Sequence, residues 1–363
     1  MPRTTTATAL AGRLGTADEP FVLDVRTPEE HDEWRIPGAA NVPLDDLATH
    51  LEELPHDREI VVHCAGGNRS TQAAVALEHA GFDVTELAGG IAEWGRVYDQ
   101  AELEADGAVV VQVRRRGKGC LSYVIGAGGE AFVVDPSTDV DRYLRLAREH
   151  GWRITRVFDT HLHADHVSGA RALAEAAGAA LHLNPADAFD FEFTPLADGD
   201  AFALPDGPLV GVSVLHTPGH TEGSTIYRVG DRAVLTGDTL FVDGVGRPDL
   251  AEKAEQFAHN LYRSLRERVL VLPDDALVLP AHYGDEVAVR PGEPVGAALG
   301  DLRRRLRPLA LDEEEFVDWA SSATAPRPPN YAEIVLANMG RSTLGDEALE
   351  ELEAGPNRCS VAS

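Results

Sequence analysis

The chain is poor in basic residues, and only two of them, Lys118 and Lys253, are lysines. Its 32 lysines and arginines face 60 aspartates and glutamates, which gives a formal net charge of −28. A surface this acidic repels phosphate backbones and anionic lipid headgroups. We therefore expect neither nucleic acid nor a membrane among the partners. An anionic substrate would have to be bound by local arginines or by a metal ion.

Cysteine and long apolar runs are scarce as well. The three cysteines, Cys64, Cys120 and Cys359, are too few and too scattered for a disulfide framework, and Cys120 is interpreted as a small buried strand residue. No run of eighteen apolar residues predicts a membrane span. Residues 1–15 lack the apolar core of a signal peptide. These absences predict a cytoplasmic protein.

The order of the predicted elements divides the chain into two domains with an extension. Within residues 1–100, strands predicted at 20–26 and 59–64 precede a helix at 70–81, which indicates a small α/β domain with a mostly parallel sheet. Residues 101–107 continue a polar stretch that is interpreted as the linker. Strands with glycine turns and then mixed elements over 108–300 fit two packed sheets with helices outside. Residues 301–363 are predicted to be a helical extension and tail, with a proline-rich break at 325–331.

The first candidate site is a cysteine at the end of a predicted strand. Cys64 is followed by Gly66, Gly67 and Arg69 and then by the helix. The glycines let backbone N–H groups point toward one position, where the helix N-terminus adds partial positive charge. Arg69 would lower the pKa of the thiol. Such a loop would stabilise a thiolate or a sulfur anion attached to it, whereas the plainer alternative is a buried cysteine beside an ordinary turn.

This loop resembles the active loop of rhodanese-type sulfurtransferases. The resemblance covers residues 20–95, with "LDVRTPEEHDEWRIPGAANVP" before the loop and "LAGGIAEW" after it. Four residues separate Cys64 from Arg69, a tighter loop than the five-residue spacing of related phosphatases and one that suits sulfur transfer. The resemblance implies that Cys64 carries sulfane sulfur. Some domains of this kind act only as sulfur carriers or docking modules, which is the alternative for this one.

The second candidate site is a set of histidines and aspartates in turns after predicted strands. Two histidines spaced two residues apart in an extended segment can point the same way, and the aspartate-histidine pair that follows them is expected to open a helix. Buried imidazoles and carboxylates without partners cost free energy, so the crowding predicts a metal site at one rim of the sheets. Asp135 is interpreted as a turn-capping residue instead. The predicted metal-site residues are His161, His163, Asp165, His166, His220, Asp238 and His282.

These motifs resemble the metallo-β-lactamase superfamily over residues 108–290. The resemblance implies an αββα sandwich with a metal site at one edge. "GDTLFVDGVGRPDL" and "GCLSYVIG" are similar to the persulfide dioxygenase branch, which is related to glyoxalase II. That resemblance implies one Fe(II) per chain held by His161, His220 and Asp238, with the other four residues orienting these ligands. Arg247 is a candidate for binding a substrate carboxylate.

Together the resemblances imply an enzyme that converts a low-molecular-weight thiol persulfide, O2 and water to thiol and sulfite. The attached sulfurtransferase would move sulfane sulfur through Cys64 to sulfite or from thiosulfate. The same seven residues also suit two Zn(II) ions bridged by Asp238, as in a thioester hydrolase of the glyoxalase II kind. Residue identity leaves both alternatives open. Enzymes of this kind often self-associate, so a homo-oligomer is an expectation.

Overall fold

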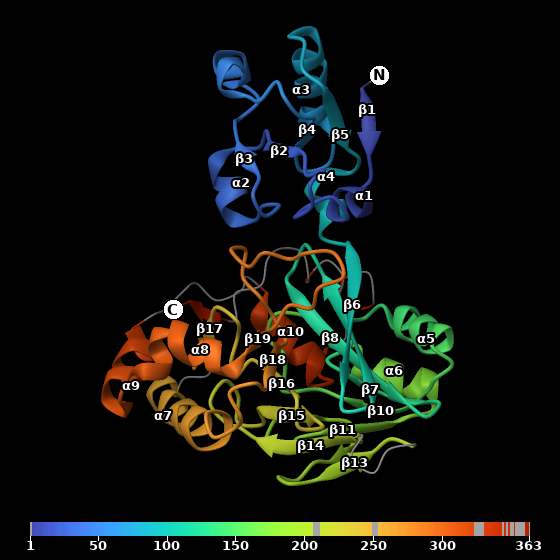
Figure 1. Cartoon of the computed structure of the whole chain (residues 1–363), viewed down its shortest axis with the longest axis vertical. Helices are drawn as coiled ribbons and strands as arrows, with labels where there is room; N and C mark the ends of the chain where they lie inside the picture. Colours follow the sequence, from blue (N-terminus) through green and yellow to red (C-terminus); the bar gives the residue numbers. More distant parts are fainter. Residues whose placement is uncertain are drawn as a thin grey trace.

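The computed structural model describes residues 2–205, 211–248, 253–322, 330–342, 345, 348, 352 and 360–362. A smaller N-terminal body stands on a larger one, and the chain passes from one to the other between α4 and β6 (Figure 1). No helix within these ranges is long and apolar enough to cross a membrane. Cys359 and residues 325–329 of the predicted proline-rich break lie outside the described residues.

The N-terminal body is an α/β domain around a parallel sheet, as predicted. Strand order is β1-β5-β4-β2-β3, and all four pairings are parallel. The central strand β4 is buried along its whole length, so Cys64 at its carboxyl end lies inside the domain. The elements are β1 (Arg3–Thr5), α1 (Ala7–Ala11), β2 (Phe21–Asp24), α2 (Pro28–Glu33), β3 (Ala40–Asn41), β4 (Ile60–His63), α3 (Asn68–His79), β5 (Val84–Leu87) and α4 (Gly90–Trp94).

The larger body is a sandwich of two sheets. The seven-stranded sheet has the order β12-β11-β10-β9-β8-β7-β6, and the six-stranded sheet has the order β13-β14-β15-β16-β18-β19. The strands are β6 (Tyr98–Ala105), β7 (Ala108–Arg115), β8 (Cys120–Ala127), β9 (Glu130–Val134), β10 (Arg153–Phe158), β11 (Ala180–Leu183), β12 (Thr194–Pro195), β13 (Ala201–Ala203), β14 (Gly211–His216), β15 (Thr225–Val229), β16 (Ala233–Gly237), β18 (Leu277–Pro280) and β19 (Ala297–Ala298). A short ribbon pairs β17 (Gly244–Gly246) with β20 (Ser360–Ala362).

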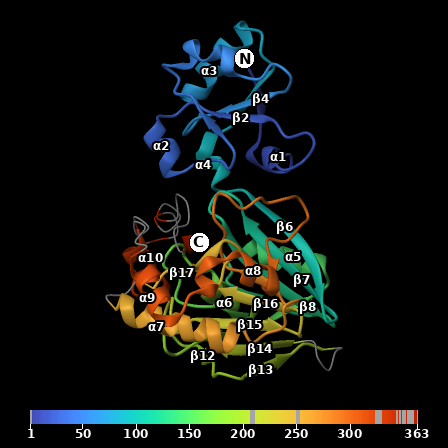
Figure 2. The ribbon, with the colours of Figure 1, turned by 60° about the vertical axis from the view of Figure 1, so that its left-hand side comes forward.

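Helices cover both outer faces of this sandwich (Figure 2). Phe158 and Tyr227 meet in the core between the sheets. Tyr143 and Leu173 bury α5 and α6 against the seven-stranded sheet. The helices are α5 (Val140–Glu149), α6 (Ala170–Ala177), α7 (Ala254–Ser264), α8 (Leu299–Arg305), α9 (Glu313–Ser322) and α10 (Tyr331–Asn338), of which α7 to α9 pack through a third apolar cluster with the six-stranded sheet. The predicted αββα architecture is confirmed.

The predicted linker is wrong. Residues 101–107 form most of β6 and its turn, and β6 pairs antiparallel with β7 along its whole length. Ala101 and Ala105 are buried while Glu102 and Glu104 are exposed. The inward side chains are therefore mostly alanines, whose weak hydrophobicity hides the alternation that marks a strand.

Candidate metal centre and cysteine loop

Three side chains from three turns meet at one edge of the sandwich. His161 follows β10, His220 follows β14 and Asp238 follows β16. The Nε2 atoms of His161 and His220 lie 3.7 and 3.4 Å from Asp238 Oδ2. All three side chains are buried. The structure therefore brings together the three residues that the sequence singled out as iron ligands.

The donor atoms of this triad suit a divalent metal. His161 Nε2, His220 Nε2 and Asp238 Oδ2 are buried and have no hydrogen-bond partner among the described residues. The other ring nitrogen of His220 donates a hydrogen bond of 2.9 Å to the carbonyl oxygen of Arg247. Burial holds the pKa of both histidines below its usual value, which keeps them in the neutral form that binds metals. Distances of 3.4 to 3.7 Å between donors match ligands placed about 2.0–2.2 Å from one ion.

A second buried group lies beside the triad. Cys120, Asp165, His166 and His282 each offer a donor atom within 4.8 Å of the others. His282 connects the two groups, because its Nε2 is 2.7 Å from Asp165 Oδ2 and its Nδ1 is 2.7 Å from Asp238 Oδ1. Burial opposes a charge on His282, but these two carboxylates outweigh it and raise the pKa of His282. The group could hold a second cation or simply orient Asp238.

Cys120 was not expected in this group. The thiol is buried at the start of β8, as interpreted, but it also lies 3.8 Å from Asp165 Oδ2. A single β-bridge joins Cys120 to His282. Burial raises the pKa of the Cys120 thiol. No spacing in the sequence marks Cys120, because the bridge joins segments more than 150 residues apart.

Asp165 and His166 do not open a helix, so that prediction is wrong. They lie in a loop, and α6 begins only at Ala170. A β-bridge between Ser137 and Ser168 keeps the backbone of this loop extended. The Gly169 N–H then donates a 2.7 Å hydrogen bond to the Pro136 carbonyl oxygen.

His163 lies beside the triad: its ring centre is 4.1 Å from that of His161, and its buried Nδ1 has no hydrogen-bond partner among the described residues. Its Nε2 is 3.0 Å from Asp135 Oδ1 and 4.0 Å from Asp159 Oδ1, and all three side chains are buried. Burial opposes the charged imidazole, but Asp135 outweighs it and raises the pKa of His163 to about 9. Asp135, which also accepts hydrogen bonds from Thr160, is thus the partner of a site histidine as well as a turn residue. The turn-capping interpretation was incomplete.

Asp187 joins the two loops that supply the histidines. Its carboxylate accepts hydrogen bonds from the Leu162 N–H at 2.9 Å, the Gly223 N–H at 2.8 Å and the Thr221 hydroxyl at 3.0 Å. A side chain at position 223 would overlap Asp187, since a Cβ there would lie 2.5 Å from its carboxyl carbon. Asp187 therefore fixes the separation of His161 from His220. Sequence reasoning missed it because it lies in an irregular segment without a motif.

Asn338 holds the same site from helix α10. Its side-chain amide donates to the carbonyl oxygens of His163 at 2.9 Å and His166 at 2.8 Å, and it accepts from the Ser168 N–H at 2.8 Å. Three backbone groups of an irregular loop are thereby satisfied by one side chain. Helix α10 is thus part of the site, although its sequence carries no sign of this.

Arg247 is buried, and its carbonyl oxygen orients His220. It follows β17 and precedes residues 249–252, which lie outside the described part of the chain. The suggested contact of Arg247 with a substrate carboxylate stays a prediction.

The Cys64 loop has the geometry of an anion cradle. Gly67 adopts φ +121°, which side-chain-bearing residues rarely do, and its N–H donates to Cys64 Sγ at 3.1 Å. The Ser70 hydroxyl lies 3.4 Å from the same sulfur. Burial raises the pKa of the thiol, but hydrogen bonds from Ser70 and from the N–H groups of Gly66 and Gly67 outweigh it, so the pKa of Cys64 is lowered.

Arg69 points to a carboxylate instead of the thiol. Its guanidinium forms two hydrogen bonds of 2.7 Å with Glu30 of α2. These bonds lower the pKa of Glu30 to about 2. Ser70, which the sequence analysis did not single out, makes the side-chain contact with Cys64. The catalytic role of Arg69 beside Cys64 stays a prediction.

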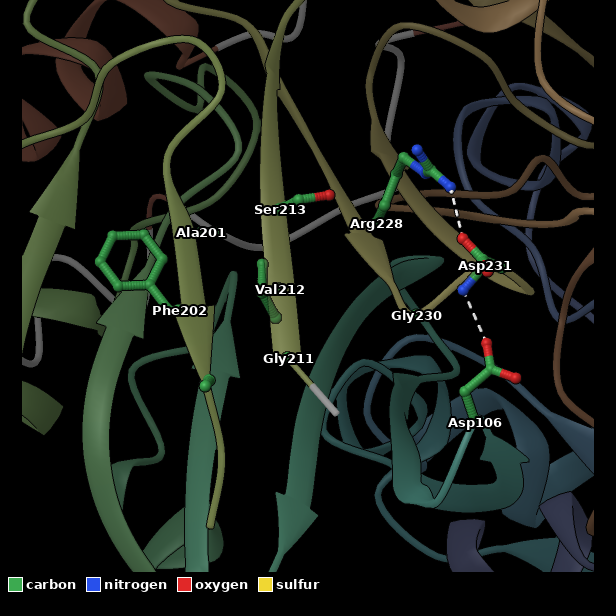
Figure 3. Close-up of a pocket in the computed structure, with 10 residues that line it drawn as sticks. Asp106, Ala201, Phe202, Gly211, Val212, Ser213, Arg228, Gly230 and Asp231 are labelled. Atoms are coloured by element: carbon green, nitrogen blue, oxygen red, sulfur yellow. Dashed lines mark hydrogen bonds and ion pairs between the residues drawn. The ribbon is translucent and has the colours of Figure 1, made fainter. Parts of the chain in front are cut away.

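A cavity of about 290 Å³ at the edge of the six-stranded sheet lies apart from both sites (Figure 3). Its charged groups are paired with one another: Arg228 donates to Asp231 at 3.1 Å, and the Asp231 N–H donates to Asp106 at 2.6 Å. It contains none of the predicted site residues, and we assign it no function.

Comparison with known families agrees with this division. Residues 115–282 match the metallo-beta-lactamase superfamily, and residues 6–96 match the rhodanese-like domain. Persulfide dioxygenase ETHE1 of Homo sapiens, a mitochondrial protein, is 30% identical over 239 residues, which cover 60% of this chain and 83% of that protein. Hydroxyacylglutathione hydrolase of Rhizobium johnstonii is 38% identical over 142 residues, which cover 38% of this chain and 52% of the hydrolase.

A solved structure extends the similarity to three dimensions. The crystal structure of ETHE1 from Myxococcus xanthus aligns with a TM-score of 0.55 at 29% identity. The alignment covers 67% of this chain and 98% of the Myxococcus chain. The larger body therefore corresponds to a complete protein of that kind, to which the N-terminal body is added.

We predict that Asn338→Ala weakens metal binding by about tenfold or more, the range seen when outer partners of metal ligands are removed. The loop carbonyls and the Ser168 N–H would lose their partner. A chelator competition titration with Zn(II) measures the change. Asn330→Ala is the control, because Asn330 precedes the same helix and its side-chain amide donates to the Leu352 carbonyl oxygen instead of to the loop of the site. Equal affinities in the two variants would contradict the assigned role.

We predict that Ser70→Ala raises the pKa of Cys64. In the native protein the thiolate forms at a lower pH than in an ordinary cysteine, and loss of the hydroxyl moves the midpoint upward. The measurement is thiolate ultraviolet absorbance against pH, with Cys64→Ser as the baseline. Thr71→Ala serves as the control, since Thr71 shares the contacts of Ser70 with Gly67 and Glu86 but has none with the sulfur. A midpoint that moves equally in both variants would refute the contact.

Proposed function

Because the chain belongs to the persulfide dioxygenase family of the metallo-β-lactamase superfamily and carries a rhodanese-like domain, we propose that it is a persulfide dioxygenase fused to a sulfurtransferase. The larger domain would convert a thiol persulfide, O2 and water to the thiol and sulfite. Its substrates would be a low-molecular-weight thiol persulfide and O2. The N-terminal domain would use sulfite or thiosulfate.

The observation that carries this proposal is the composition of the triad. Two histidines and one carboxylate, His161, His220 and Asp238, converge. Two imidazoles and one carboxylate are the donor set of non-haem Fe(II) oxygenases, and this set leaves positions open on the metal.

The chain's own residues would bind and orient the reactants. An Fe(II) ion held by His161, His220 and Asp238 would supply the redox chemistry with O2. His282, held between Asp165 and Asp238, would keep the Asp238 carboxylate turned toward the metal. Arg247 would bind a carboxylate of the thiol. The burial of the triad would keep bulk water away from the reacting sulfur.

The sulfurtransferase step would take place at Cys64. With a sulfane sulfur on Cys64, the sulfur atom of sulfite attacks the outer sulfur, the S–S bond of the persulfide breaks, and Cys64 leaves as a thiolate. The products are thiosulfate and the free enzyme. The N–H groups of Gly66 and Gly67 and the Ser70 hydroxyl would stabilise the anionic sulfur in either direction of transfer.

A binuclear zinc hydrolase is the second candidate. The group of Cys120, Asp165, His166 and His282 lies beside the triad, and a chain could load a cation there as well. The similarity to hydroxyacylglutathione hydrolase is consistent with this reading. In that case the substrate would be a thioester, and the N-terminal domain would serve as a carrier or docking module.

We predict that protein purified without added metal holds about one iron per chain and consumes O2 when a thiol persulfide is added. His220→Ala should lower the O2 uptake by more than about 100-fold, because even outer partners of metal ligands contribute 10–100-fold. Elemental analysis and an oxygen electrode make the measurement. His259→Ala is the control, since His259 pairs with Glu313 away from the site. Nearly two zinc ions per chain without O2 uptake would favour the hydrolase.

We predict that Cys64→Ser abolishes sulfur transfer from thiosulfate to a thiol and leaves persulfide-dependent O2 uptake unchanged. The hydroxyl cannot hold a sulfane sulfur, whereas the metal domain keeps its ligands. Thiocyanate formation from thiosulfate and cyanide measures the transfer independently of the thiol. Transfer that survives the substitution would leave only a docking role for this domain.

A further inference from the structure

A cavity of about 240 Å³ lies where the two domains meet. The N-terminal domain contributes the end of α2 and the segment after it, including Arg35. The larger domain contributes the turn between β7 and β8, with Arg116 and Lys118, and the segment after His282, with Tyr283 and Asp285. Figure 2 shows this junction beside α4 and the start of β6.

The segments that line the cavity continue into both candidate sites. On one side, the turn that carries Lys118 leads directly into Cys120, and Tyr283 follows His282. On the other side, α4 connects the junction to the cysteine loop. The Ile91 N–H at its start donates to the Cys64 carbonyl oxygen at 2.9 Å, and the Gly95 carbonyl oxygen after its end accepts from Arg115 at 3.1 Å. A five-residue helix spans only about 7.5 Å.

The inner wall of the cavity is cationic in a strongly acidic protein. Arg116 and Lys118 are buried, while the acidic residues of the cavity, Asp32, Glu33 and Asp285, are exposed at its mouth. Arg116 and Arg114 share a single carboxylate, Asp99. These two arginines therefore bring one more positive charge than Asp99 neutralises, and an unbalanced buried charge costs free energy.

Two buried polar groups near this wall also have no hydrogen-bond partner in the described structure. They are the Nη2 of Arg114 and the hydroxyl of Tyr283. Both groups are hydrogen-bond donors. Arg35, which also lines the cavity, makes long ion pairs: its Nη2 lies 3.7 Å from the carboxylates of Asp285 and Glu286. The guanidinium groups and the hydroxyl are the donors with which proteins bind oxyanions.

We propose that this interdomain cavity binds a small sulfur oxyanion, sulfite or thiosulfate, in transit between the two active sites. The choice of ligand rests on the proposed function, which makes sulfite in one domain and uses it in the other. The net charge of −28 repels anions from bulk solvent. An anion formed in one domain does not have to approach the acidic protein from bulk solvent. Because the two domains are tethered, its concentration near the cavity is also raised.

The test is isothermal titration of the full-length protein with sulfite and with thiosulfate. Lys118→Gln and Arg35→Gln are each expected to weaken binding at least fivefold. Arg35 is partly exposed with long ion pairs, so its variant keeps the fold even if the buried Lys118 is needed for folding. Arg96→Gln is the matched control, because Arg96 is exposed in the same domain, pairs with Glu93 and does not line the cavity. Its affinity should equal that of the native protein.

The full-length double variant Cys64→Ser/His220→Ala separates the cavity from the active sites. Retained oxyanion binding supports the proposal, whereas its loss would place the anion in an active site and overturn it. S-methylcysteine is a thioether that stands in for a carboxylate-bearing thiol substrate. Its binding in place of sulfite would also overturn the proposal, because the cavity would then be a site for the substrate carboxylate. O2 uptake in the native protein is scored separately. Oxyanion binding without O2 uptake refutes the proposed function alone, and the reverse result refutes the cavity alone.

Discussion

The structure of the metal site depends on the burial of His161, His220 and Asp238 beside one another. The Nε2 atoms of the two histidines and Oδ2 of the aspartate have no hydrogen-bond partner among the described residues. Each residue lies in a turn, and turns do not hold their own geometry as helices and strands do. The protein therefore fixes the backbone of these turns from outside. Asp187 joins the two histidine loops, and Asn338 holds the loop that continues from His161. The cost of burying an unsatisfied triad is offset only when a cation binds there.

The two domains share more than a covalent connection. The Trp34 indole N–H donates to the Gly117 carbonyl oxygen at 2.8 Å, in the turn that leads to Cys120. A Cβ at position 117 would lie 2.5 Å from the Trp94 carbonyl oxygen, so glycine is required for this close approach. The turn before the metal site thus packs directly on the domain that carries Cys64.

Much of this could be predicted from the sequence, because some signals are local. The Cys64 loop and the His161–His166 cluster are short segments whose residue types and spacing identify them. Both fold classes followed from the pattern of elements. What failed depended on contacts across long distances. The alanine-rich inner face of β6 hid a strand, and a bridge from Ser137 to Ser168 overrode the helix expected at Asp165. Asp187, Asn338 and Cys120 reach the site only through the tertiary fold.

The position of Asn338 also has a consequence for how the enzyme matures. All seven predicted metal-site residues lie between positions 161 and 282, but their loop is held by a side chain of α10. During synthesis the ribosome has exposed every one of these seven residues before Asn338 emerges. The N-terminal domain can fold while the rest is being made, but the loop of the metal site stays incompletely fixed until α10 docks. The site is therefore completed only after α10 has been synthesised, well after its own residues.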